Sequence, residues 1–400
     1  MRVFIAGVDG YLGWPLAQYL TARGHEVGGA DTFFRRQWVE EMGSWSAVPI
    51  SDIKQRLIGF KRRFGKELRF WPWDLREYAN VEKIFHEFQP EAVVHLGECP
   101  SAPYSMIDVH HTVFVQTNNI TSTLNLVYAI RDIRPEAHLV KLGTMGEYGT
   151  PPVDIPEGFF EVEFRGRKAR LPFPRLAGSW YHWSKVHGSN NIMFACKIWD
   201  LRATDLNQGV VYGTTTDEVA LDEALINRFD YDEIFGTVLN RFCVQAAIGH
   251  PLTVYGQGGQ TRGFLDIRDT VRCIELACLN PAARGECRVF NQFTEQFSVL
   301  ELAELVRTAA ANLGLSVAVN HQPDPRVESE QHYYHAKHSK LIDLGLQPHF
   351  LCDSLLDSLM NLAIRYADRI DRRTLQPKVN WRNTRNERKA EASFAATVTA

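Results

Sequence analysis

A tyrosine and a lysine stand four residues apart in the segment Tyr-His-Trp-Ser-Lys at residues 181–185. On a helix, Tyr181 and Lys185 share one face, one turn apart. An ammonium beside a phenol lowers the pKa of the phenol, so that Tyr181 can take a proton from a hydroxyl as a hydride leaves. Thr144, just after a predicted strand at 138–142, can hydrogen-bond the same hydroxyl. Although this spacing alone also occurs by chance in surface helices, the three residues together predict a hydride-transfer site.

A glycine pattern typical of dinucleotide binding follows the apolar run at residues 3–8. Gly7 permits a tight turn, Gly10 lets the backbone approach a pyrophosphate, and Gly13 lets the next helix pack closely on the strand. The N-terminus of that helix supplies oriented N–H groups for the anion. The residues between these glycines complete the predicted contacts with the cofactor: Asp9, Tyr11 and Leu12.

The predicted cofactor is NAD. Asp31 ends the second predicted strand, and a carboxylate there accepts hydrogen bonds from ribose hydroxyls and repels a 2′-phosphate. Arg35 and Arg36 lie just beyond and weaken this preference for NAD over NADP. Asp74, after the third strand, is placed to meet the adenine.

The elements that position these residues alternate between strands and helices. Apolar runs at 3–8, 26–31, 68–73, 92–96 and 138–142 are each followed by a plausible helix. This rhythm predicts an α/β fold with a doubly wound parallel (Rossmann) sheet. Residues 33–66 form a long connection, which holds a helix or an excursion.

The rhythm breaks after about residue 205, where helices are expected around 235–248, 270–278 and 300–313. We predict an NAD-binding domain at 1–205 with later elements around 264–290. A smaller interleaved substrate lobe is predicted at 206–263 and 291–371. Residues 372–400 mix charges with small polar residues and have no apolar period, which predicts a flexible tail.

The composition excludes several classes of partner. The net charge of −3 gives no reason to expect a nucleic acid or an anionic membrane as partner, and no apolar run is long enough for a membrane span. The seven cysteines are scattered without a Cys-x-x-Cys pair, so we expect no metal site and no disulfide framework. Met1 and Arg2 lead straight into a strand, which predicts no signal peptide and a cytoplasmic location.

Together these motifs resemble the extended short-chain dehydrogenase family, whose members interconvert nucleotide sugars. Further similar stretches are Val-His-Leu-Gly at 94–97, Thr-Leu-Asn at 123–125, the segment 202–213 and the segment 258–269. The resemblance implies additional contacts with NAD from Leu75, Leu96, Gly97, Asn119 and Gln208. It also implies a substrate site in which arginines meet the diphosphate of the nucleotide sugar, comprising Ser101, Tyr104, Thr144, Asn207, Gln260, Thr261, Arg262, Arg326 and Glu328.

The strand end at 142–150 is more specific. Ordinary 4,6-dehydratases of this family carry Thr-Asp-Glu there, whereas this chain has Met145 in place of the aspartate, and its glutamate is displaced to Glu147. This run, with those at 101–108, 203–213 and 291–298, resembles the UDP-sulfoquinovose synthases. The resemblance implies that UDP-glucose and sulfite, or another sulfur donor, give UDP-sulfoquinovose, the sugar donor for sulfolipid. It also implies a homodimer built on the helices that bear Asn119 and Tyr181.

The implied chemistry agrees with the residues. Tyr181 and NAD oxidise C4 of the sugar, and the ketone acidifies the C5 proton so that the C6 hydroxyl can leave. The 4-keto-5-ene then accepts a sulfur nucleophile at C6, and the hydride returns to C4. Glu147 and His182 are both candidates for the proton transfers at C5 and C6, while His95 and His187 are interpreted as structural.

The loop at 97–103 departs from the family pattern, because Cys99 and Pro100 stand where the family has Gln-Arg. An arginine there would be a natural partner for sulfite. A UDP-hexose dehydratase or epimerase that adds no sulfite therefore stays open. So does a non-catalytic NAD-sensing or scaffold protein, although a sensor needs no intact Thr144, Tyr181 and Lys185. Cys99 is interpreted as a buried, unreactive thiol rather than a nucleophile near C6.

Overall fold

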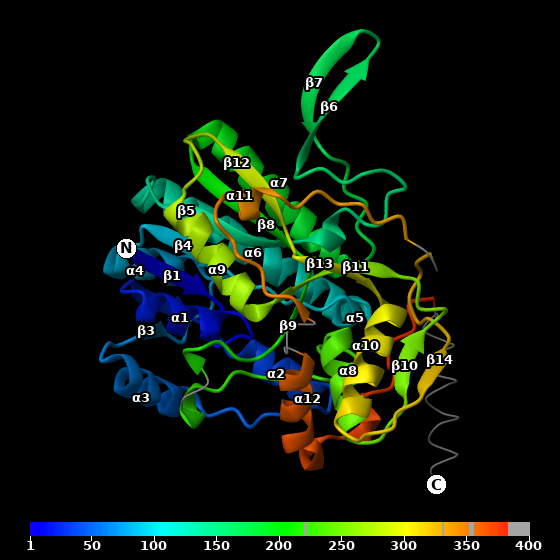
Figure 1. The fold of residues 1–400 in the computed structure, drawn as a ribbon. Helices are drawn as coiled ribbons and strands as arrows, with labels where there is room; N and C mark the ends of the chain where they lie inside the picture. The colour runs from blue at the N-terminus through cyan, green and yellow to red at the C-terminus, as the bar shows by residue number, and fades with distance from the viewer. Residues whose placement is uncertain (220–221, 330–331, 352–355, 383–400) are drawn as a thin grey trace.

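Seven parallel strands form the central sheet in the order β12-β8-β5-β4-β1-β2-β3 (Figure 1). The computed structural model describes residues 1–219, 222–329, 332–351 and 356–382. The strands are β1 (Arg2–Ala6), β2 (Glu26–Ala30), β3 (Arg69–Trp71), β4 (Ala92–His95), β5 (His138–Thr144), β8 (Arg202–Gln208) and β12 (Cys287–Gln292). The predicted doubly wound α/β fold is confirmed.

Helices cover both faces of this sheet because successive side chains of each buried strand point to opposite faces. In β1, Val3 and Ile5 pack against one helical layer, and Phe4 and Ala6 against the other. The first layer contains α1 (Gly13–Ala22), α3 (Ile53–Phe64) and α9 (Ile267–Leu279). The second contains α4 (Tyr78–Phe88), α6 (Val109–Ile133) and α7 (Trp180–Trp199).

A second hydrophobic core lies in the smaller lobe, beside the carboxyl ends of the central strands (Figure 1). Its helices are α8 (Val238–Ala247), α10 (Val299–Asn312) and α12 (Leu356–Arg365). Its sheets are β9 (Val210–Tyr212), β11 (Thr261–Asp266) and β13 (Glu295–Ser298), and the pair β10 (Leu252–Tyr255) and β14 (Val319–Gln322). The short elements are α2 (Phe34–Glu41), α5 (Ala102–Ser105), α11 (Lys340–Asp343), η1 (Met145–Glu147), η3 (Glu223–Leu225), η5 (Ala367–Arg369) and η6 (Arg372–Thr374).

The connection at 33–66 contains two helices, α2 and α3, where one helix or an excursion was expected. The segment between them also joins the second lobe, since Ala47 and Val48 are buried in its core. Two strands cross the predicted boundaries: β11 starts before residue 264, and β12 extends past residue 290. The division of the chain into two domains stays a prediction.

An antiparallel hairpin was not predicted. Strands β6 (Phe159–Phe164) and β7 (Arg167–Pro172) project from the body of the molecule (Figure 1). Phe160 at its base packs on Phe173, whereas Phe164 near the tip is exposed.

The C-terminal segment differs from the flexible tail expected from residue 372. Leu375 is buried in the core of the second lobe, and Val379 packs in a cluster that includes Trp38. The backbone N–H of Trp381 donates to the carbonyl of Pro325. These apolar contacts fix residues 372–382 on the molecule, while the rest of the expected tail, 383–400, lies outside the described residues.

None of the helices that the structure describes combines the length and apolar character needed to cross a membrane.

Candidate functional site

Two cavities meet at the carboxyl ends of the central strands. The first, of about 360 Å³, runs from the glycine turn to α7 and is here called the cofactor cavity. The second, of about 500 Å³, lies between the strand ends and the smaller lobe and is called the substrate cavity. Residues that line both cavities are Pro100, Thr144, Tyr181, Gln208, Gly209, Val210, Phe235 and Thr237. The predicted Thr144 and Tyr181 therefore lie where two ligands would touch.

The glycine turn has no room for side chains. Gly7 has φ of +83°, and a Cβ on Gly13 would lie 2.1 Å from the carbonyl oxygen of Gly7. Gly10 lines the cofactor cavity, with Tyr11 and Leu12 beside it. The turn and the start of α1 thus form a cradle for a pyrophosphate, as predicted.

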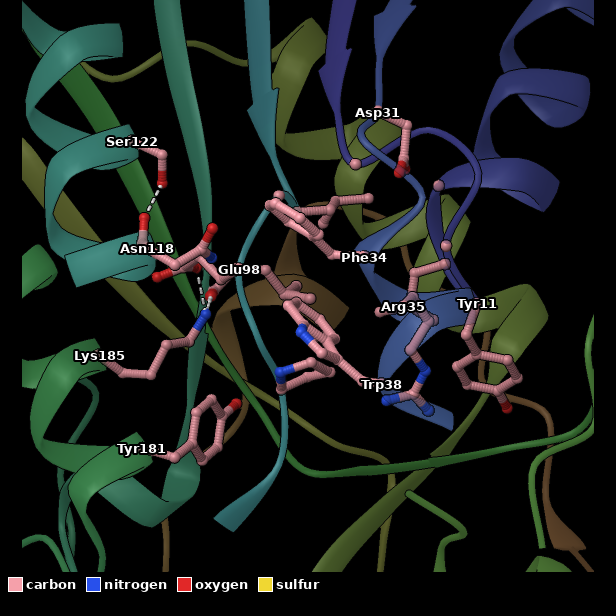
Figure 2. A pocket seen from close by; sticks show the side chains of 18 of the residues that line it. Tyr11, Asp31, Phe34, Arg35, Trp38, Glu98, Asn118, Ser122, Tyr181 and Lys185 are labelled. Carbon is pink, nitrogen blue, oxygen red and sulfur yellow. Dashed lines mark hydrogen bonds and ion pairs between the residues drawn. The ribbon is translucent and has the colours of Figure 1, made fainter. Parts of the chain in front are cut away.

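Arg35 points two unpartnered donors into this site. Its Nη2 bonds Asp230 at 2.6 Å, but its Nε and Nη1 are buried without a hydrogen-bond partner. Figure 2 shows Arg35 and Tyr11 together at one end of the cofactor cavity. A buried guanidinium with free donors fits an anionic group, so the residues present suit a dinucleotide diphosphate.

Asp31 is held by the backbone rather than by a cation. Its oxygens accept the N–H groups of Asp9 at 2.9 Å and Phe33 at 2.7 Å. Burial and the neighbouring Asp9 raise the pKa of Asp31 to about 6. The carboxylate lines the cofactor cavity, where it can accept ribose hydroxyls.

The prediction that Asp9 and Arg36 contact the cofactor is wrong, because neither residue lines the cofactor cavity. The Asp9 carboxylate is buried between Arg36, at 2.6 Å, and Arg56, at 2.8 Å. Because Arg36 is paired with Asp9, its guanidinium is not free to receive a 2′-phosphate. This pairing strengthens the preference for NAD over NADP.

Most of the remaining residues predicted to contact the cofactor line its cavity. These are Asp74, Leu75, Leu96, Gly97, Lys185 and Gln208. Asn119 does not: its side chain accepts the N–H of Cys99 at 2.8 Å and donates to Ser184 Oγ at 2.9 Å. It fixes the loop after β4 against α7, while the adjacent Asn118 faces the cavity (Figure 2).

The ammonium of Lys185 is bound by Glu98, a residue that the sequence analysis missed. Figure 2 shows this ion pair, and Lys185 Nζ also donates to the carbonyl of Leu142. The charge of Lys185 is therefore compensated, and the predicted lowering of the Tyr181 pKa is not seen. Burial, followed by the charge of Glu98, instead raises the pKa of Tyr181 above its ordinary value.

His182 borders the substrate cavity with Met145 and Gly146. A Cβ on Gly146 would lie 2.4 Å from His182 Nε2, so glycine is needed for the imidazole to approach the strand end. His182 Nδ1 lies 3.0 Å from Ser179 Oγ. Burial, with Arg326 and Arg262 nearby, lowers the pKa of His182 to about 3, so the ring is neutral at physiological pH.

Glu147 does not reach either cavity, which argues against its predicted role in proton transfer. It is fully buried, with Lys141 Nζ at 3.3 Å and Ser189 Oγ at 3.1 Å, and it pairs with Arg175. Because η1 turns Glu147 under the strand ends, of the two candidates only His182 faces the substrate.

The far wall of the substrate cavity carries two predicted arginines. Arg262 pairs with Glu328 and His332, and Arg326 lies over the ring of Trp381 at 5.5 Å. Although burial opposes ionisation, these two arginines hold the pKa of Glu328 below its ordinary value. Gln260 and Ser101 also line this cavity, as predicted.

Three predicted substrate residues lie elsewhere. Tyr104 packs against Trp38 and donates its hydroxyl to Glu41 at 2.8 Å. Asn207 is buried beneath the sheet end, where it donates to the Tyr148 hydroxyl at 2.8 Å. Thr261 alternates with the cavity-facing Gln260 and Arg262 and does not line the cavity.

The sequence analysis also missed several lining residues of both cavities. In the cofactor cavity these are Phe34, Trp38, Trp73, Glu98, Asn118 and Ser122, and in the substrate cavity they include Glu233, Arg241, Tyr255 and Trp381. Arg241 is 6% exposed on α8. A lone arginine in an amphipathic helix gives no sequence signal that it faces inward.

Cys99 lies in the loop after β4 and is fully buried. Burial raises the pKa of its thiol to about 12, so the thiolate is negligible at neutral pH. The high pKa agrees with the interpretation of Cys99 as an unreactive thiol. The neighbouring Pro100 lines both cavities.

Comparison with known proteins gives a consistent result. Residues 3–291 match the NAD dependent epimerase/dehydratase family. The chain is 54% identical over 381 residues to the chloroplastic UDP-sulfoquinovose synthase of Spinacia oleracea, an alignment that covers 95% of this chain and 79% of that protein. It is 43% identical over 385 residues to the UDP-sulfoquinovose synthase of Sulfolobus acidocaldarius, with 96% and 98% covered.

Solved structures share the fold. The UDP-glucuronic acid 4-epimerase of Bacillus cereus, in complex with UDP-glucuronic acid and NAD, matches with a TM-score of 0.66 and 22% identity, covering 92% of this chain and 99% of that chain. The UDP-glucose 4-epimerase of Stenotrophomonas maltophila, with bound NAD, matches with a TM-score of 0.69 and 19% identity, covering 92% and 98%.

Proposed function

The chain belongs to the NAD-dependent epimerase/dehydratase family and, within it, to the UDP-sulfoquinovose synthases, and from this premise we propose that it joins sulfite to UDP-glucose. The chain is an NAD-dependent enzyme that modifies a nucleotide sugar. The product is UDP-sulfoquinovose, and the cofactor is recycled. The identity to two such synthases favours this function over a dehydratase or epimerase that adds no sulfite.

One observation carries the site assignment. Tyr181 and Thr144 stand where the cofactor cavity and the substrate cavity meet, so a sugar hydroxyl can lie between them and a nicotinamide. Arg262, Arg326 and Arg241 line the substrate cavity from the smaller lobe, and guanidiniums suit a diphosphate. This arrangement supports a UDP-sugar with its hexose toward Tyr181 and its nucleotide toward the smaller lobe.

The chain supplies the proton transfers, and bound NAD supplies the hydride acceptor. Tyr181 takes the proton of the C4 hydroxyl, which Thr144 orients. In the tautomer with its proton on Nδ1, which lies 3.0 Å from Ser179 Oγ, His182 presents the lone pair of Nε2 to the C5 proton. The same proton, passed to the C6 hydroxyl, lets that group leave as water. Sulfite, entering as HSO₃⁻, then forms the C6–S bond through its sulfur lone pair, and the proton that it brings passes to C5. As the hydride returns to C4, Tyr181 gives its proton back to the C4 oxygen.

Sulfite must be held without an arginine in the loop after β4, where Pro100 stands. The guanidiniums of Arg241, Arg262 and Arg326 line the substrate cavity together with the carboxylates of Glu233 and Glu328. This excess of positive charge draws anions into the cavity. We propose that it serves both the diphosphate and the incoming sulfite.

The binding of NAD is expected to weaken in acid. Asp31 must be ionised to accept the ribose hydroxyls, and its pKa is raised to about 6. Affinity should therefore be constant above pH 7 and fall progressively below pH 6, as the carboxylate takes up a proton. The affinity can be measured by titrating the tryptophan fluorescence of the protein with NAD at each pH across this range. Asp31→Asn should bind about tenfold more weakly and lose the dependence, whereas an unchanged profile in Asp31→Asn would contradict the assignment.

We propose a homodimer that pairs α6 and α7 of two copies. The outer surfaces of these two helices carry exposed apolar side chains: Val109, Val113, Tyr128, Trp180, Phe194 and Ile198. Such a patch on two packed, parallel helices suits a four-helix interface with a second copy. Sedimentation at micromolar concentration should give the mass of two chains, and Phe194→Asp should give one.

A cytoplasmic location is proposed from the thiols. Six cysteines among the described residues are free, and five of them are buried. Unpaired thiols are typical of a reducing compartment.

The sulfur donor can be identified by label transfer. Radiolabelled sulfite, incubated with enzyme, NAD and UDP-glucose, should deliver label to the nucleotide-sugar fraction. Labelled thiosulfate should deliver none. Label from thiosulfate alone would show that another sulfur donor is used.

A further inference from the structure

Glu98 is a buried carboxylate that the mechanism above does not use. It follows β4 in the loop at 97–101, and its side chain is 2% exposed. One oxygen, Oε2, binds the ammonium of Lys185, while the other, Oε1, has no hydrogen-bond partner. An acceptor left unpaired in the interior is costly, so a partner for Oε1 is expected when the site is filled.

The position of Glu98 indicates which ligand donates a hydrogen bond to Oε1. Glu98 and Lys185 line the cofactor cavity, and neither lines the substrate cavity. Figure 2 shows them on the side of Tyr181 and Asn118, away from the end marked by Asp31 and Arg35. A dinucleotide seated on Arg35 and the glycine turn therefore extends its other nucleoside toward Glu98.

We propose that Glu98 is a positioning residue of the hydride-transfer site, with Oε2 holding Lys185 and Oε1 accepting a hydrogen bond from a ribose hydroxyl of the dinucleotide. The inference rests on the use of NAD in the proposed function, but not on sulfite. It assigns the carboxylate two tasks: it orients the lysine, and it sets the net charge beside Tyr181.

The second task follows from the groups that surround the pair. Glu98 is faced by Lys185 from α7, His95 from β4 and Lys141 from β5. The phenol of Tyr181 is faced by Glu98, Lys141, Cys99 and Glu147. With Glu98 ionised, the charge of Lys185 is cancelled, and the phenol of Tyr181 holds the proton that it has taken from the C4 hydroxyl. The tyrosine can then serve as the acid when the hydride returns to C4.

Glu98→Gln and Glu98→Asp separate the two tasks. In Glu98→Gln the charge of Lys185 is uncompensated, so the pKa of Tyr181 falls. The acid limb of the pH profile of kcat/KM should move about one unit lower. Glu98→Asp keeps the charge but shortens the side chain, so its acid limb should stay in place. Both variants should bind NAD about tenfold more weakly, measured by quenching of Trp38 and Trp73, which line the cavity.

A matched control is Glu275→Gln. Glu275 is also buried and ion-paired, with Arg272, and it accepts a hydrogen bond from the Tyr19 hydroxyl, but it lies on α9 outside both cavities. This variant should lose stability without a change in NAD affinity or in the pH profile. If Glu98→Gln keeps both the wild-type affinity and the wild-type acid limb, the proposal is overturned. If that variant does not fold, unchanged NAD affinity in Glu98→Asp overturns it instead. Neither readout depends on whether sulfite is the nucleophile.

Discussion

Replacing Tyr181 with phenylalanine is expected to lower kcat by about 10³-fold or more, because the variant has no group that can take the C4 proton. The tyrosine lies where the two cavities meet, and its hydroxyl makes no hydrogen bond to the rest of the described chain. Its removal should therefore cost little stability. Steady-state turnover of UDP-glucose with sulfite, beside a thermal melt, measures both effects.

Tyr78→Phe is the matched control for this variant. Tyr78 lies on α4 and donates its hydroxyl to Asp132 at the surface, outside both cavities. Its loss should change kcat by less than about twofold. Retained turnover in Tyr181→Phe, with intact NAD binding, would contradict the proposed mechanism.

Substitution of His182 by glutamine is expected to stop the reaction after the first hydride transfer. The C4 oxidation needs Tyr181 and Thr144, whereas the C5 and C6 proton transfers need the imidazole of His182. Overall turnover should fall by about 10²- to 10⁴-fold. Reduced nicotinamide should accumulate on the enzyme when UDP-glucose is added, because the 4-keto intermediate cannot go on to the sulfonated ketone that takes the hydride back at C4.

The absorbance of reduced nicotinamide during one turnover shows whether His182 acts after the first hydride transfer or already in substrate binding and the first step. A variant that forms no reduced cofactor would assign His182 to substrate binding or to the first step. His86→Gln, an exposed histidine on α4, serves as the control and should behave as wild type. Since the pKa of His182 is lowered to about 3 by burial, its own titration should leave turnover unaffected between pH 6 and 9.

The site residues that the sequence predicted well are those whose roles follow from local spacing. The glycine turn, Asp31, and the Tyr181–Lys185 pair each depend on contacts within one turn or one strand end. The incorrect predictions fall on close neighbours of residues that do line a cavity. Neighbouring residues on a helix point about 100° apart, so Asn118 faces the cavity while Asn119 holds the loop. In the same way Glu147, two residues past Met145, turns beneath the sheet.

The partners of charged residues could not be predicted from spacing, because they join elements far apart in the chain. Lys185 meets Glu98 across 87 positions, and Arg35 meets Asp230 across 195. Such pairings reverse two sequence-based arguments. Lys185 does not lower the pKa of Tyr181 in this structure, and Arg36, which Asp9 holds, does not weaken the preference for NAD.

The fold was predictable where apolar runs alternate with helical patterns, and less so elsewhere. The hairpin β6–β7 carries a signal that was overlooked, since Phe160, Val162 and Phe164 alternate with Glu161 and Glu163. The packing of residues 372–382 had no such signal. It rests on isolated apolar residues, Leu375, Val379 and Trp381, whose partners come from distant segments.

The central claim is the formation of a carbon–sulfur bond at C6 of a nucleotide sugar. Its most direct test is mass spectrometry of UDP-glucose incubated with the enzyme and NAD, with and without sulfite. We predict a sulfite-dependent product in which SO₃H has replaced one hydroxyl, with no net consumption of NAD. A dehydrated or isomeric UDP-sugar that forms equally well without sulfite would contradict the account, and would assign this catalytic site to a different nucleotide-sugar reaction.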